Sequence, residues 1–318
     1  MDADDREVKP IFFVTADKTI SHSGRMSWGT CNRKFQLGKT KFFYRKDREG
    51  SKALSFGKGF GTGIQALLAG DSLDLAFIKS ALDCDAQYSF EKDAIKSNQS
   101  LAHCHEAIQS FYYGQLPALK NDWEVLDLEG LYGVELPFVI EYPNGTVERG
   151  YLDVVLRNKT TGEIIVLEIK TSGKLSVGTD ADWLNSPQGI MYLVVLAYLL
   201  HKKGLNLNSK ILFIEYNKPH KKYTIFPFDK PIRERVEFLL SVYHDVLSRA
   251  AQFKAGHKMF KSGKCVSYNR QCEYFGVCDL NHELEYAEVE VDSSKTNLVQ
   301  FEDIYNYLLG ELNASTIS

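Results

Sequence analysis

The chain has 318 residues, of which 44% are hydrophobic and 25% are charged, and its net charge at pH 7 is −3. These values are ordinary for a globular protein, and the length allows one large domain or two small ones with a sizeable core. The negative net charge excludes a general attraction to nucleic acid, so any DNA binding must use local patches of positive charge.

The first part of the chain is predicted to be helical after a leader at residues 1–20. Ser21 and Ser23 are good N-cap residues and indicate that a helix begins there. Residues 32–52 form the most basic stretch of the chain and also contain four aromatic side chains. In order, we expect a strand at 11–15, helices at 21–35 and 56–69, and two or three further helices up to about residue 119.

From residue 123 the pattern of apolar residues changes to the period of β-strands. We expect strands at 124–131, 132–141, 147–157, 163–171, 209–217 and 223–228, and helices at 188–203, 231–254 and 298–312. This order of elements predicts an α/β or α+β core, in which a mixed sheet is flanked by helices.

No apolar run approaches the ~20 residues that a membrane-spanning helix requires. The N-terminal sequence is acidic and lacks the basic and then apolar pattern of a secretory signal. We therefore expect a cytoplasmic protein with no membrane association, whose cysteines stay reduced.

Three residues on two neighbouring predicted strands suggest a catalytic centre. Glu168 and Lys170 are two positions apart, so they share one face of their strand, while Leu167 and Ile169 point to the other face. Asp153 lies on the preceding strand, across a short turn. Two such carboxylates can hold Mg²⁺ or Mn²⁺, and the lysine can orient a water or stabilise charge on a phosphate. The alternative is a solvated strand face on which Glu168 and Lys170 pair by charge.

Gln188 and Tyr192 follow on the next predicted helix. Their i, i+4 spacing places both on one helix face, where each can hydrogen-bond a phosphate or a metal-bound water. An ordinary amphipathic helix is the alternative. Glu135, on an earlier predicted strand, can supply a further carboxylate or can be a surface residue with a salt-bridge partner.

These motifs resemble the RecB-like branch of the PD-(D/E)xK nucleases. Gly150-Tyr-Leu-Asp153 and Glu168-Ile-Lys170-Thr171 are similar to its motifs II and III, and Gln188-Gly-Ile-Met-Tyr192 is similar to its QxxxY motif. The segment from Ser21 to Phe35 resembles its N-terminal helix. Residues 56–65 lie where the family has a Gly-rich turn and a helical histidine, but Gln65 takes the place of that histidine as the expected metal ligand.

The resemblance implies a restriction-endonuclease-like mixed central sheet flanked by helices, with an N-terminal helical region and a C-terminal cysteine-rich clasp. Residues 21–280 form a single nuclease domain in this interpretation, followed by an acidic tail with a short helix at 281–318. Within the domain we expect a helical insert at about 57–120, the catalytic sheet at about 123–228 and a Cys-rich loop at 257–280.

The cysteines fit members of this family that carry a 4Fe–4S cluster. Cys31 stands near the N-terminus, and Cys265, Cys272 and Cys278 follow near the C-terminus. Four thiolates brought together would hold such a cluster. A zinc site, which usually uses two close CxxC pairs, and the absence of any metal remain alternatives. The two other cysteines, Cys84 and Cys104, are expected in the core.

The basic stretch after Cys31 is the candidate DNA contact, although a charge run is often only a solvated surface. Its cations can neutralise phosphates and its aromatic rings can stack on unpaired bases. Trp183, in the loop beside the expected active edge, can contact a strand end. The DNA-binding candidates are Arg33, Lys34, Lys39, Lys41 and Trp183.

The sequence therefore predicts a nuclease that depends on Mg²⁺ or Mn²⁺ and hydrolyses phosphodiester bonds of DNA. The resemblance implies an exonuclease that processes single-stranded DNA or DNA with a free end, in recombination or repair, with protein partners from those pathways. It also implies a phage or prokaryotic source, and therefore the cytoplasm of a bacterium or a phage-infected host. The alternative is a catalytically degenerate module that binds DNA or assembles a complex, and Gln65 is the feature in its favour.

Overall fold

The protein folds as two compact units in the computed structural model. Unit 1 contains the described residues of Met1–Asp47, Pro137–Gly150 and Pro231–Ser318, and unit 2 contains those of Arg48–Leu136 and Tyr151–Lys230. The structure describes residues 11–40, 52–84, 92–128, 131–174, 183–205, 210–254, 259, 261, 265–267, 270–272, 274, 276–278, 285–292 and 296–317.

Unit 2 is built on a mixed sheet. Its strands are β3 (Trp123–Val125), β7 (Val147–Asn158, from Tyr151 onward), β8 (Ile164–Ser172), β9 (Lys210–Asn217) and β10 (Lys222–Phe228). β8 pairs parallel with β9, whereas β7 with β8, β9 with β10 and β3 with β7 are antiparallel. β8 is the central strand of this group, and its apolar run from Ile164 to Leu167 is buried on both faces, as a central strand requires.

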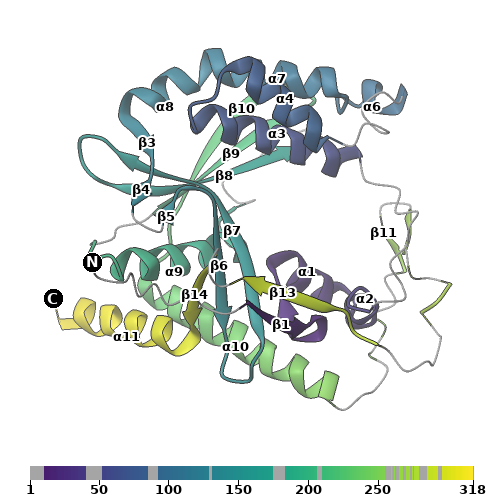
Figure 1. The fold of residues 1–318 in the computed structure, drawn as a ribbon, viewed down its shortest axis with the longest axis vertical. Coiled ribbons are helices and arrows are strands. Elements are labelled where there is room, and N and C mark those ends of the chain that lie inside the picture. The colour runs from purple at the N-terminus through teal and green to yellow at the C-terminus, as the bar shows by residue number, and fades with distance from the viewer. Residues whose placement is uncertain are drawn as a thin grey trace, which may run out of the picture. The chain divides into compact units, whose positions relative to one another are not determined.

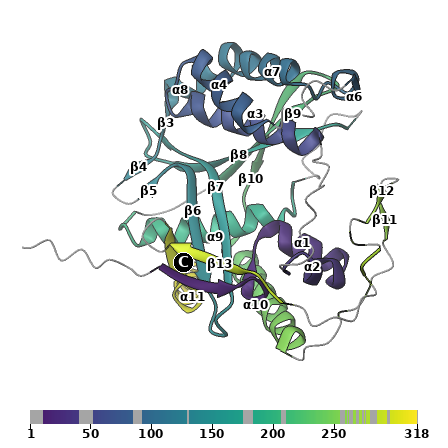
Figure 2. The ribbon, with the colours of Figure 1, turned by 45° about the vertical axis from the view of Figure 1, so that its right-hand side comes forward.

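Helices cover both faces of this sheet. The helices of unit 2 are α3 (Lys52–Leu68), α4 (Leu73–Asp83), α6 (Lys92–Lys96), α7 (Leu101–Gly114), α8 (Leu116–Asp122) and α9 (Pro187–His201). α3, α4 and α7 lie together over one face, and Leu167, Ile169 and Ile214 pack into the core beneath them (Figures 1 and 2). α9 lies against β9 and β10, with Gly189 at the rings of Phe213 and Phe228. The predicted fold class, a mixed sheet flanked by helices, is confirmed.

Unit 1 is assembled from segments far apart in the sequence. β1 (Ile11–Thr15) pairs with β13 (Glu288–Asp292), as Figure 2 shows. β14 (Asn297–Gln300) pairs parallel with β6 (Val134–Glu141), and β2 (Thr19–Ile20) pairs parallel with the start of β7. Its other elements are η1 (Ala16–Lys18), α1 (His22–Thr30), α2 (Asn32–Leu37), α10 (Ile232–Lys254), β11 (Val266–Ser267), β12 (Arg270–Gln271) and α11 (Phe301–Ile317).

The observed elements differ from the predicted ones at several places, among them the predicted tail, where β13 and β14 precede α11. The helix predicted at 21–35 is two helices, because Cys31 takes an extended backbone and caps α2 by accepting from the Lys34 backbone N–H. Within the predicted leader, the strand expected at 11–15 is present as β1, and Thr19–Ile20 form a second strand, β2, that was not predicted. The described residues between 124 and 132 lie in or beside short strands, β3, β4 (Asp127–Leu128) and β5 (Leu131–Tyr132).

The cysteines outside the predicted clasp are core residues, as expected. Cys84 and Cys104 are 7% and 0% exposed and belong to the core beneath α3 and α7. In the part of the chain that the structure describes, no helix is long and apolar enough to cross a membrane.

Two glycines of α3 make a matched test of close helix packing. A Cβ at Gly59 would lie 2.2 Å from Cys84 Sγ and 2.9 Å from the Ser80 carbonyl oxygen, whereas a Cβ at Gly61 would meet nothing within 4 Å. We expect Gly59→Ala to lower the free energy of unfolding by about 1–3 kcal/mol through overpacking. Gly61→Ala should instead raise it by roughly 0.5–1 kcal/mol, because alanine is the better helix former. Urea unfolding of both variants measures the difference, and equal effects would contradict the packing of α3 on α4.

Candidate active site

The antiparallel pairing of β7 with β8 places the two predicted acidic ligands opposite each other. Val154 pairs with Leu167, and continuing this register by one residue sets Asp153 opposite Glu168. Asp153 Oδ2 accepts a hydrogen bond of 2.9 Å from the Ile169 backbone N–H, which fixes the carboxylate at this edge.

The position of Gly150, the glycine of motif II, leaves no room for a larger side chain. A Cβ at Gly150 would lie 2.3 Å from the ring of Phe138 on the neighbouring strand β6, so a larger residue would force these two strands apart. Because Gly150 precedes Asp153 on the same strand, this close approach helps to fix the path of β7 toward the carboxylate.

Lys170 connects the acidic pair to helix α9. Its ammonium nitrogen lies 2.5 Å from Glu168 Oε1 and donates a hydrogen bond of 3.0 Å to Gln188 Oε1. Gln188 Nε2 in turn donates to the Tyr192 hydroxyl at 2.7 Å. The Ser186 side chain caps α9 by accepting from the Gly189 N–H, so the helix begins where Gln188 can reach the lysine. The five predicted catalytic residues are therefore close together within unit 2.

Burial dominates the electrostatics of this group. Glu168 is 1% exposed, whereas the Lys170 side chain is 30% exposed and reaches solvent. Burial, reinforced by the charge of Glu168, raises the pKa of Asp153 to about 7, and burial also raises the pKa of Glu168 although Lys170 opposes the shift. Burial alone would lower the pKa of Lys170, but the two carboxylates raise it above its ordinary value.

Tyr192 remains a neutral phenol, since burial raises its pKa well above the ordinary value. It therefore keeps its hydroxyl proton while it accepts from Gln188.

Glu168 Oε2 is buried with no hydrogen-bond partner among the described residues. A buried carboxylate oxygen without a partner is costly unless a cation or a proton neutralises it.

The donor set fits a hard divalent cation. Mg²⁺ is commonly held by one or two carboxylates and keeps several waters, so Asp153 and Glu168 supply enough protein oxygens. Across the residues that the structure describes, no group of three or more His, Cys, Asp or Glu side chains is arranged to hold a metal ion. Any ion here would therefore complete its coordination with water or substrate oxygens.

Gln65 and Glu135 contact each other, because Gln65 Nε2 donates to Glu135 Oε1. Gln65 is buried on α3, and the charge of Glu135 contributes to the raised pKa of Glu168, so both lie near the acidic pair. Glu135 has a φ of +47°, a left-handed conformation that is rare for a residue with a side chain. Strain of this kind concentrates at functional sites, and here it directs a carboxylate toward Gln65.

Glu215 is a residue that sequence reasoning missed. The parallel register of β8 and β9 pairs Lys170 with Glu215, whose side chain is 2% exposed and whose Oε1 has no hydrogen-bond partner among the described atoms. The signal was available, since a single acidic residue interrupts the apolar strand Ile211–Tyr216.

The candidate DNA contacts have different surroundings. Arg33 is 1% exposed and donates hydrogen bonds to Gln36 and to the Cys278 carbonyl, so a phosphate contact is incompatible with its packing and we correct it to a structural residue. Lys39 donates to the Thr19 hydroxyl, and Trp183 stacks on Phe213 with ring centroids 4.6 Å apart. Lys34 is half-buried, and Lys41 lies outside the described residues.

The four clasp cysteines all belong to unit 1, are half-buried and are not joined in disulfides. The β11–β12 hairpin brings Cys265 and Cys272 side by side, because the Cys272 N–H donates to the Cys265 carbonyl at 2.7 Å. Arg33, two residues after Cys31, donates to the Cys278 carbonyl at 3.2 Å. The Arg33 side chain thus links the first and last cysteine segments, and a backbone hydrogen bond links the two middle cysteines.

No protein-family model matches this sequence, and no curated protein matches it. Among solved structures, the chain resembles a candidate exonuclease from Eubacterium rectale, with 14% identity and a TM-score of 0.43 over 78% of this chain and 86% of that chain. It also resembles the protein SSO0001, with 15% identity and a TM-score of 0.29 over 78% of this chain and 93% of that chain. Both TM-scores are below 0.5, so neither likeness assigns a family or a function to this chain.

The raised pKa of Asp153 predicts that this carboxylate destabilises the metal-free protein. Its pKa in the fold, about 7, is above the ordinary value of 3.8. The loss of folding free energy caused by the ionised carboxylate is therefore complete above pH 7 and disappears as the pH falls toward 4. We expect Asp153→Asn to raise the free energy of unfolding in EDTA by on the order of 2 kcal/mol at pH 8 and by much less at pH 5. Thermal unfolding at both pH values measures the effect.

Asp127→Asn is the matched control, because Asp127 is exposed on β4 of the same unit. It should leave the melting temperature unchanged at both pH values. A melting temperature for Asp153→Asn that is lower than that of the wild type at pH 8 would show that the ionised carboxylate is well accommodated without metal.

Proposed function

We propose that this protein is a metal-dependent nuclease that hydrolyses phosphodiester bonds of DNA. The observation that carries the proposal is the buried Glu168 carboxylate, which has one oxygen 2.5 Å from the Lys170 ammonium and the other without a hydrogen-bond partner among the described residues. Asp153 lies opposite on β7, and Lys170 reaches solvent. A structural ion pair alone would leave no reason to place a second, half-buried carboxylate beside it.

Each residue has a chemical role in this proposal. Asp153 and Glu168 hold Mg²⁺ or Mn²⁺, and such an ion, when bound, polarises the scissile phosphate and lowers the pKa of a coordinated water. Lys170 presents its ammonium group at the exposed side of the site, where it stabilises negative charge that develops on the phosphate. Gln188 holds that ammonium in place through its 3.0 Å hydrogen bond, and Tyr192 holds Gln188.

The finer part of the proposal concerns the substrate and the biological setting. We propose an exonuclease that acts on single-stranded DNA or DNA with a free end, in recombination or repair in a phage or a prokaryote. Its support is the resemblance in motif order, in which Gly150 to Asp153, Glu168 to Lys170, and Gln188 to Tyr192 precede three C-terminal cysteines.

One observation favours a catalytically degenerate DNA-binding module as a second candidate. Gln65 stands where the resembling family has a metal-binding histidine, and its amide is engaged with Glu135. A module of this kind would bind DNA without cleaving it. The assay below separates the two candidates, because only the nuclease requires the metal.

The nuclease proposal predicts cleavage of labelled linear single-stranded DNA with Mn²⁺ or Mg²⁺ and none in EDTA. Lys170→Ala and Glu168→Ala should each lower the rate at least about 100-fold, because each removes a group that acts on the transition state. Time courses on gels measure the rate. Circular single-stranded DNA in parallel distinguishes exonuclease from endonuclease action, since an exonuclease leaves the circle intact.

Lys210→Ala is the control for loss of positive charge. Lys210 is an exposed lysine on the neighbouring strand β9, and its 3.2 Å ion pair with Glu163 contributes little to stability. This variant should cleave at the wild-type rate. DNA binding without cleavage under both metals would support the degenerate module and reject the nuclease.

We further propose that Cys31, Cys265, Cys272 and Cys278 hold a 4Fe–4S cluster in unit 1, which requires these thiols to move together, since the described side chains form no group of three that could hold a metal. The Arg33 hydrogen bond to the Cys278 carbonyl and the pairing of the Cys265 and Cys272 backbones support the proposal, because they join the segments that carry the thiols. Four thiolates are the ligand set that such clusters use. The cluster would fasten the start of unit 1 to its C-terminal part.

This second proposal predicts a brown protein with bound iron and acid-labile sulfide after anaerobic purification. Cys272→Ser and Cys278→Ser should lose the colour and most of the iron, because each removes a thiolate ligand. Cys104→Ala is the control, since Cys104 is buried in the core of unit 2 and should leave the iron content unchanged. A colourless protein with stoichiometric zinc would contradict the cluster and support the zinc alternative.

A further inference from the structure

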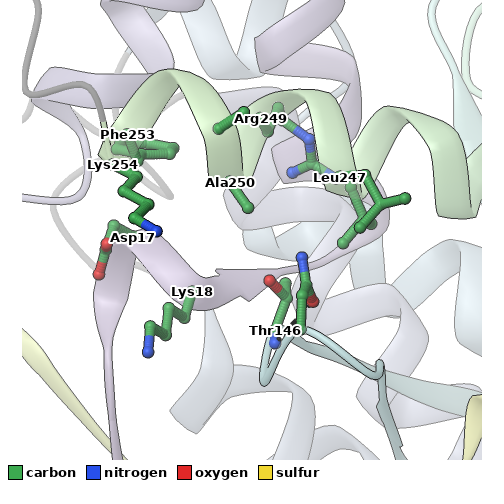
Figure 3. A pocket seen from close by; sticks show the side chains of 11 residues that line it. Asp17, Lys18, Thr146, Leu247, Arg249, Ala250, Phe253 and Lys254 are labelled. Atoms are coloured by element: carbon green, nitrogen blue, oxygen red, sulfur yellow. Dashed lines mark hydrogen bonds between the residues drawn. The ribbon is translucent and has the colours of Figure 1, made fainter.

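A cavity of about 480 Å³ lies within unit 1, whereas the residues of the candidate active site belong to unit 2. It is enclosed by η1, by the turn between β6 and β7, and by the C-terminal half of α10 (Figure 3). Its volume falls within the range of about 300–1,000 Å³ that small-molecule sites occupy.

Arg249 is a buried cation in the wall of this cavity. Its side chain is 5% exposed, and its Nε lies 3.2 Å from Asp245 Oδ2. The guanidinium carbon lies 5.6 Å and 5.7 Å from the ring centroids of Trp28 and Phe35, which fix the plane of the group. Its Nη2 has no hydrogen-bond partner among the described residues. A buried guanidinium with an unused donor is well suited to an anion that enters the cavity.

Two other polar groups of the cavity also lack partners in the described structure. Asn144 Oδ1 accepts from the Thr146 N–H at 3.1 Å, which orients the amide so that Nδ2 is the free donor, and Nδ2 is buried without a partner. Asp17 Oδ1 is likewise buried without a partner. Arg249 and Asn144 therefore offer unused hydrogen-bond donors to an anion, and Asp17 offers one unused acceptor to a donor group of the ligand.

Cations outnumber carboxylates among the residues that line the cavity, which include Lys18, Arg249 and Lys254 with Asp17. The carboxylates of Asp245 and Glu148 also act on Arg249, although neither residue lines the cavity. Nearby, burial and then the charge of Arg249 lower the pKa of Lys39 to about 8, as expected where cations crowd together. An anionic group would relieve this repulsion.

The remaining wall is apolar. Val246, Leu247, Ala250 and Phe253 come from one side of α10, so an organic body can pack beside the charged groups. Figure 3 shows Leu247 and Ala250 of α10 across the cavity from Thr146. A phosphate, an apolar or aromatic body and a hydrogen-bond donor are together the features of a nucleotide.

We propose that this cavity binds a nucleoside monophosphate, either free or as the terminal nucleotide of a DNA chain, with its phosphate at Arg249, Lys18 and Lys254. Asn144 donates to the same phosphate, Asp17 accepts from the base or sugar, and the apolar side of α10 packs against the base. This is a binding site separate from the proposed hydrolytic centre and does not depend on it.

Calorimetric titration with deoxyadenosine 5′-monophosphate in EDTA tests the proposal, since the chelator prevents any cleavage. Binding should be at least about tenfold weaker for deoxyadenosine, which lacks the phosphate, and for inorganic phosphate, which lacks the base. The Lys18→Ala/Lys254→Ala double variant should lose at least about tenfold in affinity, and so should Arg249→Lys, which keeps the charge but not the planar fork.

Two controls locate the binding. The Lys222→Ala/Arg233→Ala variant removes two exposed cations outside the cavity and should bind as tightly as the wild type. Lys170→Ala should also retain the affinity, because a monophosphate bound at the hydrolytic centre would be lost there instead. Melting temperatures of all variants identify any that fail to fold. If Arg249→Lys is unstable, the Lys18→Ala/Lys254→Ala variant still tests the proposal, because both lysines are exposed and their loss should not disturb the fold.

The outcomes are distinct. Displacement of the monophosphate by 5′-phosphorylated oligothymidylate, but not by its 5′-hydroxyl form, identifies a DNA end as the ligand, and no displacement identifies the free nucleotide. Absence of binding, equal affinity for deoxyadenosine, affinity unchanged in the cavity variants, or affinity lost in Lys170→Ala would each overturn the proposal.

Discussion

The candidate site depends on the burial of negative charge between two antiparallel strands. Glu168 lies in the interior, with Asp153 opposite it and a single ammonium group in contact. Carboxylates in such surroundings favour a proton or a cation, and the raised pKa values of both acids express that preference. The apolar residues on the other face of β8 anchor the strand in the core, so the charged face cannot turn away. Burying these charges lowers the stability of the fold, and a role in binding a metal ion would explain why they are kept.

Much of this arrangement could be predicted from the sequence because it follows from local periodicity. Alternation along β8 separates Glu168 and Lys170 from Leu167 and Ile169, and a four-residue spacing on α9 aligns Gln188 with Tyr192. The fold class followed from the order of helical and strand-like segments. Each of these inferences requires only neighbouring residues in one or two elements, which is the range over which sequence patterns are informative.

The features that escaped prediction depend on contacts between distant segments. The basic run around Arg33 suggested a DNA contact, but the burial of this side chain depends on Cys278, 245 residues later. The break at Cys31 arises because its sulfur competes for the Lys34 N–H, which periodicity does not report. Glu215 came beside Lys170 only through the parallel register of β8 with β9. The left-handed conformation of Glu135 could not be predicted from secondary-structure propensities either, since most residues with a side chain avoid it.

The division of the chain between its two units has a consequence for biosynthesis. Unit 2 is complete once residue 230 has been made, whereas unit 1 requires the N-terminal segment, the hairpin around residue 144 and everything from residue 231 onward. Domains generally fold as units while the ribosome is still translating. β1 must therefore wait for its partner strand until β13 has been made, although β2 can already pair with the start of β7.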